Sequence, residues 1–191
     1  MEVPAAVVLN VNIQVDSDKI VIQYSVKNES GAEVFLVNHL TRYQQDKGWI
    51  PDSAIVYSKV DQKGNVEISK RIPPVPKDRL VTPRNFYVTP LVAGDRFEEK
   101  LVLSVPLHEN QPYSPLVPPL PEPREIDGSI SFCLGYLEAT SSWEAKQVEV
   151  HGVSAYTLSR RNFDVVADKP PVEKLLTSKA EKARIYVVAQ P

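Results

Sequence analysis

The chain has 191 residues, which suits one large domain able to bury roughly 70% of its unfolded surface. A hydrophobic content of 42% and a charged content of 24% argue against disorder over most of the length. The net charge is −2, and no segment gathers basic residues with interleaved aromatic residues, so we expect no nucleic-acid partner.

Alternation of apolar and polar residues predicts a first pair of strands. Apolar side chains recur at every second position over Val7–Val15 and again over Ile20–Val26, and Asp16–Asp18 has the composition of a turn. These segments therefore predict a hairpin. The nearly continuous apolar run Val34–Val37 predicts a central strand that is covered on both faces.

Turn residues divide the next part of the chain. Asp46–Gly48 turns the chain towards Trp49, and a loop at Asp61–Asn65 that contains glycine joins two further strands. The strands expected here are Ala54–Val60, Val66–Lys70, Asn85–Thr89 and Phe97–Val105. A short proline-rich connection, Ile72–Pro76, lies between the second and third of them.

The C-terminal part mixes strand and helix signals. The clearest alternation in the chain is Ile130–Tyr136, and we also expect strands at Gln147–Leu158, Asn162–Ala167 and Arg184–Ala189. Between Pro171 and Arg184, apolar residues fall near helical spacing after two prolines, which a helix tolerates at its start. This pattern predicts one short C-terminal helix beside nine or ten strands.

Proline dominates one segment. Six of the twelve residues from Pro112 to Pro123 are proline, so this segment forms an extended connection and neither a helix interior nor a central strand. Its P-x-x-P spacings are typical of ligands for aromatic grooves. A structural crossing is the preferred interpretation, because apolar residues along the segment would pin it to the domain. Burial of Tyr113, Leu116 and Leu120 would favour the structural crossing, and their exposure would favour the ligand.

Short strands separated by turn signals predict an all-β fold, an antiparallel β-sandwich, with a closed barrel as the alternative. We expect a single domain over residues 1–191, with residues 159–191 as an extension packed on it. The segments IVIQYSVKNESGAEVFLVN and DGSISFCLGY resemble strands of bacterial immunoglobulin-like or fibronectin-like sandwiches over residues 5–158. That resemblance implies the immunoglobulin-like fold and no particular function.

No catalytic, metal or cofactor motif stands out. His39, His108 and His151 lack the neighbours of a hydrolytic site, and their separations of 69 and 43 residues do not suit a metal site. Cys133 lies in an apolar strand, where a thiol acts as a small hydrophobic group. The few scattered glycines form no phosphate-binding loop. We therefore expect no cofactor and no enzymatic activity.

The leading hypothesis is a non-catalytic protein-interaction or accessory module with an unidentified protein partner. The residues of its candidate partner-binding surface are Trp49, Tyr113, Leu116, Leu120 and Trp143. One alternative is a protease inhibitor that presents a rigid loop. Another is a carbohydrate or small-ligand binder that uses Trp49 or Trp143 with neighbouring tyrosines.

The remaining expectations concern location and assembly. No window approaches the ~18 apolar residues of a membrane span, so we expect no membrane association. As written, the chain is expected to be a soluble cytoplasmic protein, or a periplasmic or secreted one if a signal peptide has been removed. The edge strands of an open sandwich also make a homodimer a reasonable expectation.

Overall fold

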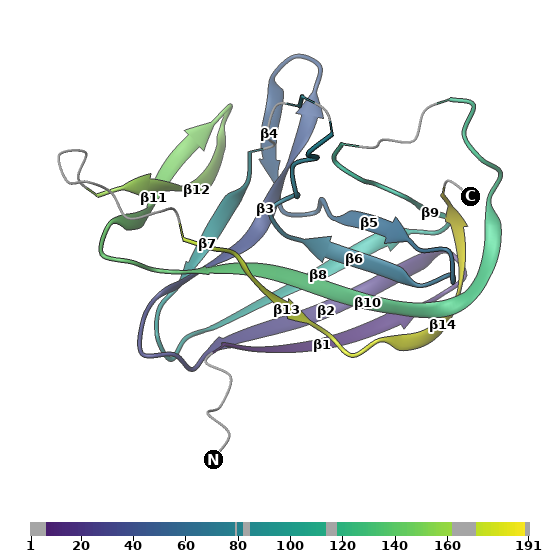
Figure 1. The fold of residues 1–191 in the computed structure, drawn as a ribbon, viewed down its shortest axis with the longest axis horizontal. Coiled ribbons are helices and arrows are strands. Elements are labelled where there is room, and N and C mark those ends of the chain that lie inside the picture. The colour runs from purple at the N-terminus through teal and green to yellow at the C-terminus, as the bar shows by residue number, and fades with distance from the viewer. Residues whose placement is uncertain (1–6, 79, 82–84, 114–117, 162–170, 190–191) are drawn as a thin grey trace.

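A computed structural model describes residues 7–78, 80–81, 85–113, 118–161 and 171–189 (Figure 1). These residues form fourteen strands and no helix, which confirms the all-β class. The strands of the first half are β1 (Val7–Val15), β2 (Lys19–Asn28), β3 (Val34–Gln44), β4 (Gly48–Asp52), β5 (Tyr57–Val60), β6 (Val66–Lys70), β7 (Tyr87–Leu91) and β8 (Arg96–Ser104). Those of the second half are β9 (Leu107–His108), β10 (Arg124–Glu138), β11 (Trp143–Val150), β12 (Val153–Arg160), β13 (Lys174–Thr177) and β14 (Glu181–Val188).

The smaller sheet has three strands in the order β1-β2-β8. The predicted hairpin at its edge is confirmed: β1 pairs with β2 from end to end, and the Asp16 amide donates to the Lys19 carbonyl in the turn at 2.8 Å. The side chains that alternate along β2 point to one face and are buried there, as period-two spacing requires; they are Ile20, Ile22, Tyr24 and Val26.

The larger sheet is organised around β10. One edge of this long strand pairs with β14 and then β13, and the other pairs with β6 and then β3 (Figure 1). The pairings of β6 with β10 and of β9 with β14 are parallel, so the expectation of a purely antiparallel arrangement is corrected at these two places. Neither sheet closes on itself among the described strands.

The predicted C-terminal helix is wrong. The residues near helical spacing lie in β13, in β14 and in the segments beside them. This segment pairs instead with one edge of β10. The Ser178 amide donates to the Phe132 carbonyl at 2.8 Å, and the Phe132 amide donates to Ser178 Oγ at 2.9 Å. Backbone pairing with a strand distant in sequence therefore outweighs the local preference for a helix.

The strand predicted at Gln147–Leu158 is also wrong, because it is a hairpin of β11 and β12. His151 and Gly152 form its two-residue turn with φ values of 52° and 83°. Positive φ at both positions matches the twist of the flanking strands, and glycine adopts it without strain. The strand predicted at Asn162–Ala167 lies outside the described residues.

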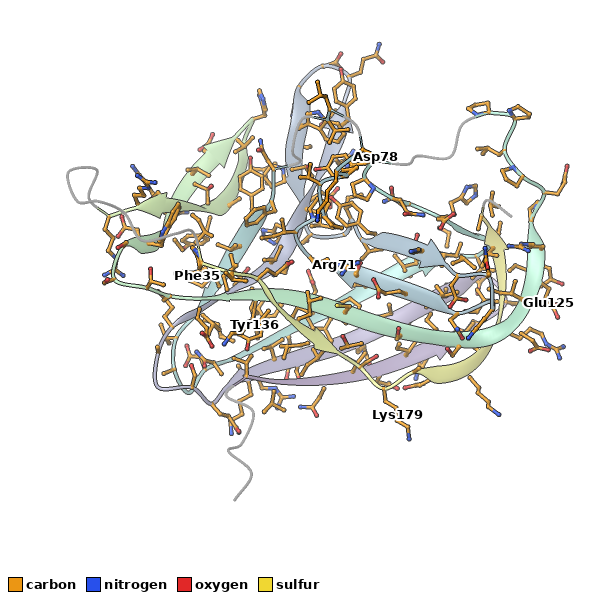
Figure 2. All side chains as sticks on the ribbon, in the orientation of Figure 1. Phe35, Arg71, Asp78, Glu125, Tyr136 and Lys179 are labelled. Atoms are coloured by element: carbon orange, nitrogen blue, oxygen red, sulfur yellow. The ribbon has the colours of Figure 1, made fainter. Side chains whose placement is uncertain are left out.

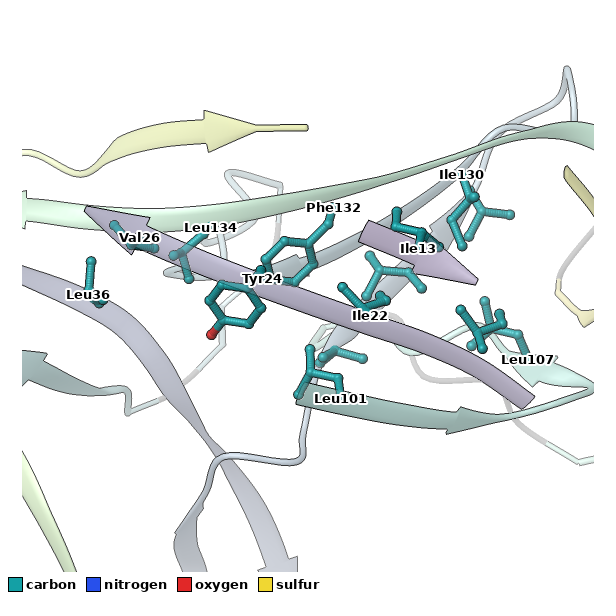
Figure 3. Packing of buried hydrophobic residues seen from close by; sticks show 14 of the residues in the cluster. Ile13, Ile22, Tyr24, Val26, Leu36, Leu101, Leu107, Ile130, Phe132 and Leu134 are labelled. Atoms are coloured by element: carbon teal, nitrogen blue, oxygen red, sulfur yellow. The ribbon is translucent and has the colours of Figure 1, made fainter. Parts of the chain in front are cut away.

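Two apolar clusters hold the fold together. The main core lies between the two sheets and includes Ile22 and Leu101 from the smaller sheet, and Ile130 and Phe132 from the larger one (Figure 3). The second cluster lies on the other side of β3 and consists of the buried Phe35, Val37, Leu40, Val88 and Leu137 with partly buried neighbours. Successive residues of β3 serve the two clusters in turn, which confirms the prediction of a strand covered on both faces.

Candidate functional site

The two proline-rich connections meet over the outer face of β5 and β6. There they line a concave site of about 190 Å³, called the proline groove below. Its floor is the face of the hairpin that points away from the main core, and its walls are the segment after β6 and the segment after β9. The lining residues are Tyr57, Ser58, Lys59, Glu67, Ser69, Arg71, Pro73, Pro74, Pro76, Gln111, Pro112 and Tyr113.

The position of each wall is fixed where its connection leaves the sheet. The Glu173 carboxylate crosses β10 and accepts a hydrogen bond from the Ile72 amide at 2.6 Å, directly before the first prolines. Burial raises the pKa of Glu173. On the other side, the backbone of Asn110 pairs with that of Ser58 at 3.0 and 3.1 Å just before Pro112. Because proline fixes φ, the lining prolines Pro73, Pro74, Pro76 and Pro112 stiffen the described part of both walls beyond these anchors.

The charges of the described residues that line the groove have a net positive sign. Among the described lining residues, Lys59 and Arg71 are basic and Glu67 is the acidic one. Arg71 Nη2 lies 3.3 Å from Glu67 Oε1, so one basic group is partly compensated. Figure 2 shows Arg71 in the middle of the visible face, well away from Glu125 at the far end of β10. The groove therefore offers aromatic and proline surface beside a modest positive charge.

A second concave site lies below the β11–β12 hairpin, where Trp143 and Phe86 line a space of about 480 Å³. This site is called the Trp143 cavity below. Apolar members of the second cluster, such as Leu137 and Leu158, form much of its lining. Ile72, at the start of the first proline-rich connection, also contributes.

A third feature is an aromatic pair on the β3–β4 hairpin. Tyr43 and Trp49 are cross-strand partners, 59% and 42% exposed, with ring centroids 5.4 Å apart in an edge-on arrangement. Edge-on rings leave no single flat platform of the kind on which a sugar ring stacks. The pair contributes exposed aromatic surface outside both concave sites.

A charged cluster is buried in the main core. Lys70 is fully buried and its ammonium pairs with the Glu99 carboxylate, which also accepts a hydrogen bond from the Tyr24 hydroxyl. The ammonium donates a further bond to the Ser53 carbonyl at 2.5 Å. Burial lowers the pKa of Lys70, although Glu99 opposes the shift, and burial together with the Glu99 charge raises the pKa of Tyr24.

The cluster connects the two sheets, because Lys70 ends β6 while Glu99 and Tyr24 are cross-strand partners on β8 and β2. Its ammonium has no exposed surface, so it cannot meet a substrate from solvent in this arrangement. Lys70 and Glu99 act as a polar tie inside an apolar core, where removal of one partner is costly.

The residues predicted as a binding surface lie in separate places. Tyr113 lines the proline groove, Trp143 lines its own cavity, and Trp49 lies on the β3–β4 hairpin. Leu120 is 48% exposed, and Leu116 lies outside the described residues. The structure therefore brings Tyr113 and Trp143 to two different sites, and their role in partner binding stays a prediction.

The alternation of the sequence contains a signal for the buried cluster. Lys70 continues the inward alternation of Val66 and Ile68, and Glu99 stands between the inward residues Phe97 and Leu101. Opposite charges at inward positions of two strands indicate a buried pair. No comparable pattern indicated the proline groove, because its walls come from connections that are far apart in sequence.

Cys133 and the three histidines do not form a site with one another. Cys133 is buried on β10, where burial raises its pKa and Thr177 Oγ1 lies 3.7 Å from its sulfur. His39 is half-buried near Lys70, and His108 and His151 are exposed. Across residues 7–78, 80–81, 85–113, 118–161 and 171–189, no group of acidic, histidine or cysteine side chains is arranged to hold a metal ion.

Comparison with protein-family models gives no match, and comparisons with curated proteins and with solved structures give none either. The described residues also contain no helix that could span a membrane. The expectations about compartment, nucleic acid, membrane association and a homodimer therefore stay predictions.

Proposed function

We propose that this chain is a non-catalytic binding module whose proline groove holds a short, extended segment of a partner protein. The observation that carries the proposal is that both proline-rich connections, one following β6 and the other following β9, meet over the same face of the β5–β6 hairpin. Stiff walls favour binding because little conformational entropy is lost when a ligand enters.

The fold supports this role by holding the groove on a framework. Two sheets that share one core are the basis of an immunoglobulin-like sandwich, and we infer that class for the whole chain. The β5–β6 hairpin forms a rigid floor for the proline groove, because its inner face buries Val66, Ile68 and Lys70 in the main core. The outer face is left for recognition.

The groove favours a particular mode of recognition. The outer edge of β5 is already paired with Asn110, and Glu109 Oε1 accepts a hydrogen bond from the Val60 amide at 3.2 Å. A partner therefore does not extend the sheet as an added strand here. It lies across the face of the hairpin, with apolar side chains against Tyr57 and Tyr113 and an acidic group towards Lys59 and Arg71.

Selection from a library of random linear peptides, displayed on phage and screened against the immobilised protein, tests the proposal. We expect enriched peptides to combine apolar or proline residues with at least one acidic residue. Arg71→Gln should weaken a selected peptide by about tenfold, as expected for a charged contact at the centre of an interface. Lys100→Gln, which removes a basic group from the smaller sheet instead, serves as the matched control.

Two outcomes would overturn the assignment. One is a selection that enriches nothing above a control surface, and the other is a set of peptides that bind Arg71→Gln and Lys100→Gln equally well. Circular dichroism of both variants establishes that each is folded before affinities are compared. Affinities should be measured at low and physiological salt, because salt screens the attraction between charges that keep some contact with water.

Exposure of the long proline-rich connection favours a second candidate, a protease inhibitor. Leu120 is 48% exposed between exposed Pro119 and partly exposed Pro121, so an apolar side chain is presented on a stiff segment. Assays against a panel of serine and cysteine proteases, with Leu120→Asp as the paired variant, test this idea. Uninhibited turnover across the panel would end it.

A further inference from the structure

β1 is an edge strand of the smaller sheet, and it is regular over its whole length. The strand order is β1-β2-β8, so one edge of β1 pairs with β2, and no strand among the described residues pairs with the other edge (Figure 1). The register with β2 runs without a shift from Val7↔Asn28 to Val15↔Ile20. The second edge therefore presents backbone amides and carbonyls at the spacing that another strand would meet.

The sequence of β1 carries none of the features by which edge strands exclude other chains. Those features are charged side chains, proline and bulges. β1 reads VVLNVNIQV and has no charged residue and no proline. β8, the opposite edge of the same sheet, carries Arg96, Glu98, Glu99 and Lys100 within its nine residues. The β8 edge is therefore protected against pairing, and the β1 edge is not.

The apolar core is incompletely covered along β1. Leu9, Val11 and Val15 pack against the main core but are only partly buried. The inward residues Ile20 and Ile22 of the neighbouring β2 have no exposed surface. The difference arises because β2 has a strand on each side, whereas the described residues place a strand on one side of β1 only. A further strand beside β1 would remove the remaining apolar surface from water.

From these observations we propose that β1 pairs antiparallel with β1 of a second copy of this chain, so that the two smaller sheets become continuous. An antiparallel pair of identical strands is symmetric about one residue, and inward side chains must face inward side chains. A two-fold axis at Val11 meets both conditions and pairs the whole strand. Leu9 then faces Ile13 of the second copy on the core side, and Asn10 faces Asn12 on the solvent side.

The sequence of β1 satisfies both faces of this pairing by itself. The core side joins apolar side chains, as in the interior of a sheet, and the solvent side joins asparagine amides, which donate and accept hydrogen bonds across the strands. No like charges meet, because the strand has none. The contact is isologous, so it closes at two copies. It lies on the smaller sheet, apart from the proline groove, and does not depend on the proposed function.

Two double variants test this interface by sedimentation equilibrium of the full chain at about 100 µM, where a weak contact is populated. Asn10→Lys with Asn12→Lys should weaken the dimer by about tenfold, because each lysine faces a lysine of the other copy. Asn10→Asp with Asn12→Lys is the matched control, and it should retain the dimer because opposite charges then face each other. Both positions are exposed, and circular dichroism establishes that each variant is folded. Two added lysines also offset the net charge of −2, so overall repulsion between copies does not explain a loss.

Cysteine cross-linking tests the register. Val11→Cys should form a disulfide-linked dimer under mild oxidation, because the two-fold axis brings the two thiols together. Leu9→Cys should not, because its two copies would lie about 13 Å apart along the strands. Cys133, the one native cysteine, is buried and does not compete. A protein that stays monomeric in the sedimentation experiment, equal dissociation constants for the two double variants, or equal cross-linking of the two cysteine variants would overturn the inference.

Discussion

The main core and the second cluster differ in how completely the strands enclose them. The main core is covered by both sheets, and its central side chains, such as Ile22, Phe132 and Ile130, have almost no exposed surface. Among the described residues, the second cluster has five buried members and a larger set of half-buried neighbours. Those neighbours include Tyr57 of the proline groove and Phe86, Ile72 and Leu158 of the Trp143 cavity.

This difference separates stability from recognition. Apolar surface that is removed completely from water stabilises the folded state, and the main core supplies most of it. Apolar surface that is only partly removed remains available to a ligand. Both concave sites border the second cluster, so we expect substitutions in the main core to act on folding and substitutions around the second cluster to act on binding.

The largest expected effect comes from a matched pair of phenylalanines. Phe132→Ala should lower the free energy of unfolding by about 4 kcal/mol, because a fully buried ring leaves a cavity. Phe86→Ala, at the edge of the second cluster, should cost about 1 kcal/mol, because its ring is only partly buried in the folded protein. Urea denaturation measures both, and equal losses would contradict the distinction between the two regions.

The buried ion pair of the main core gives the next effect. Lys70→Met leaves the Glu99 carboxylate without its cation, which should cost about 3 kcal/mol. The double variant Lys70→Met with Glu99→Leu should recover much of that loss, since a well-packed apolar pair replaces the charges. Glu99→Leu alone completes the comparison. If the loss in the double variant equalled the sum of the losses in Lys70→Met and Glu99→Leu, the pair would not act as a unit.

Gly135 tests the contact that positions one wall of the proline groove. A Cβ atom there would lie 2.0 Å from Glu173 Oε1 and 3.2 Å from the Arg71 Cα, so alanine must displace the carboxylate that holds the Ile72 amide. Gly135→Ala should cost about 2 kcal/mol, within the range for overpacking. Gly31→Ala is the control, because nothing lies within 4 Å of its added Cβ.

The smallest effect concerns pH. Burial and the Lys70 charge lower the pKa of His39 below its ordinary value of 6.5. Between the lowered and the ordinary value the unfolded chain binds more protons than the folded one, so stability falls as the pH drops through this window. His39→Asn should reduce that fall in urea denaturation at pH 7 and pH 5, and an unchanged fall would contradict the assignment.

Much of the fold could be predicted because its signals are local. The alternation in β2 and β10 and the turns at Asp16–Asp18 and Asp61–Asn65 need no information from distant residues. The C-terminal strands could not be recognised in the same way. β13 exists because β10 offers it an edge, and no pattern within four residues reports such a partner.

The candidate sites were less predictable for a related reason. Their positions near loops make Tyr113 and Trp143 candidates for binding, yet what surrounds each side chain depends on how distant segments pack. Tyr57 begins the β5–β6 hairpin and Arg71 follows it, and no sequence motif identifies either residue as part of a site. Residues that share an apolar face can be inferred from spacing, whereas residues that share a groove depend on the paths of two connections.

The most direct test of the central claim is the affinity of a selected peptide for Tyr113→Ala and for Tyr186→Ala. Tyr113 lines the proline groove, whereas Tyr186 is 48% exposed on β14 opposite Glu125, which Figure 2 places far from Arg71. Isothermal titration should show binding weakened by about tenfold in Tyr113→Ala and unchanged in Tyr186→Ala. Equal affinities for the two variants would contradict the assignment of the proline groove as the binding site.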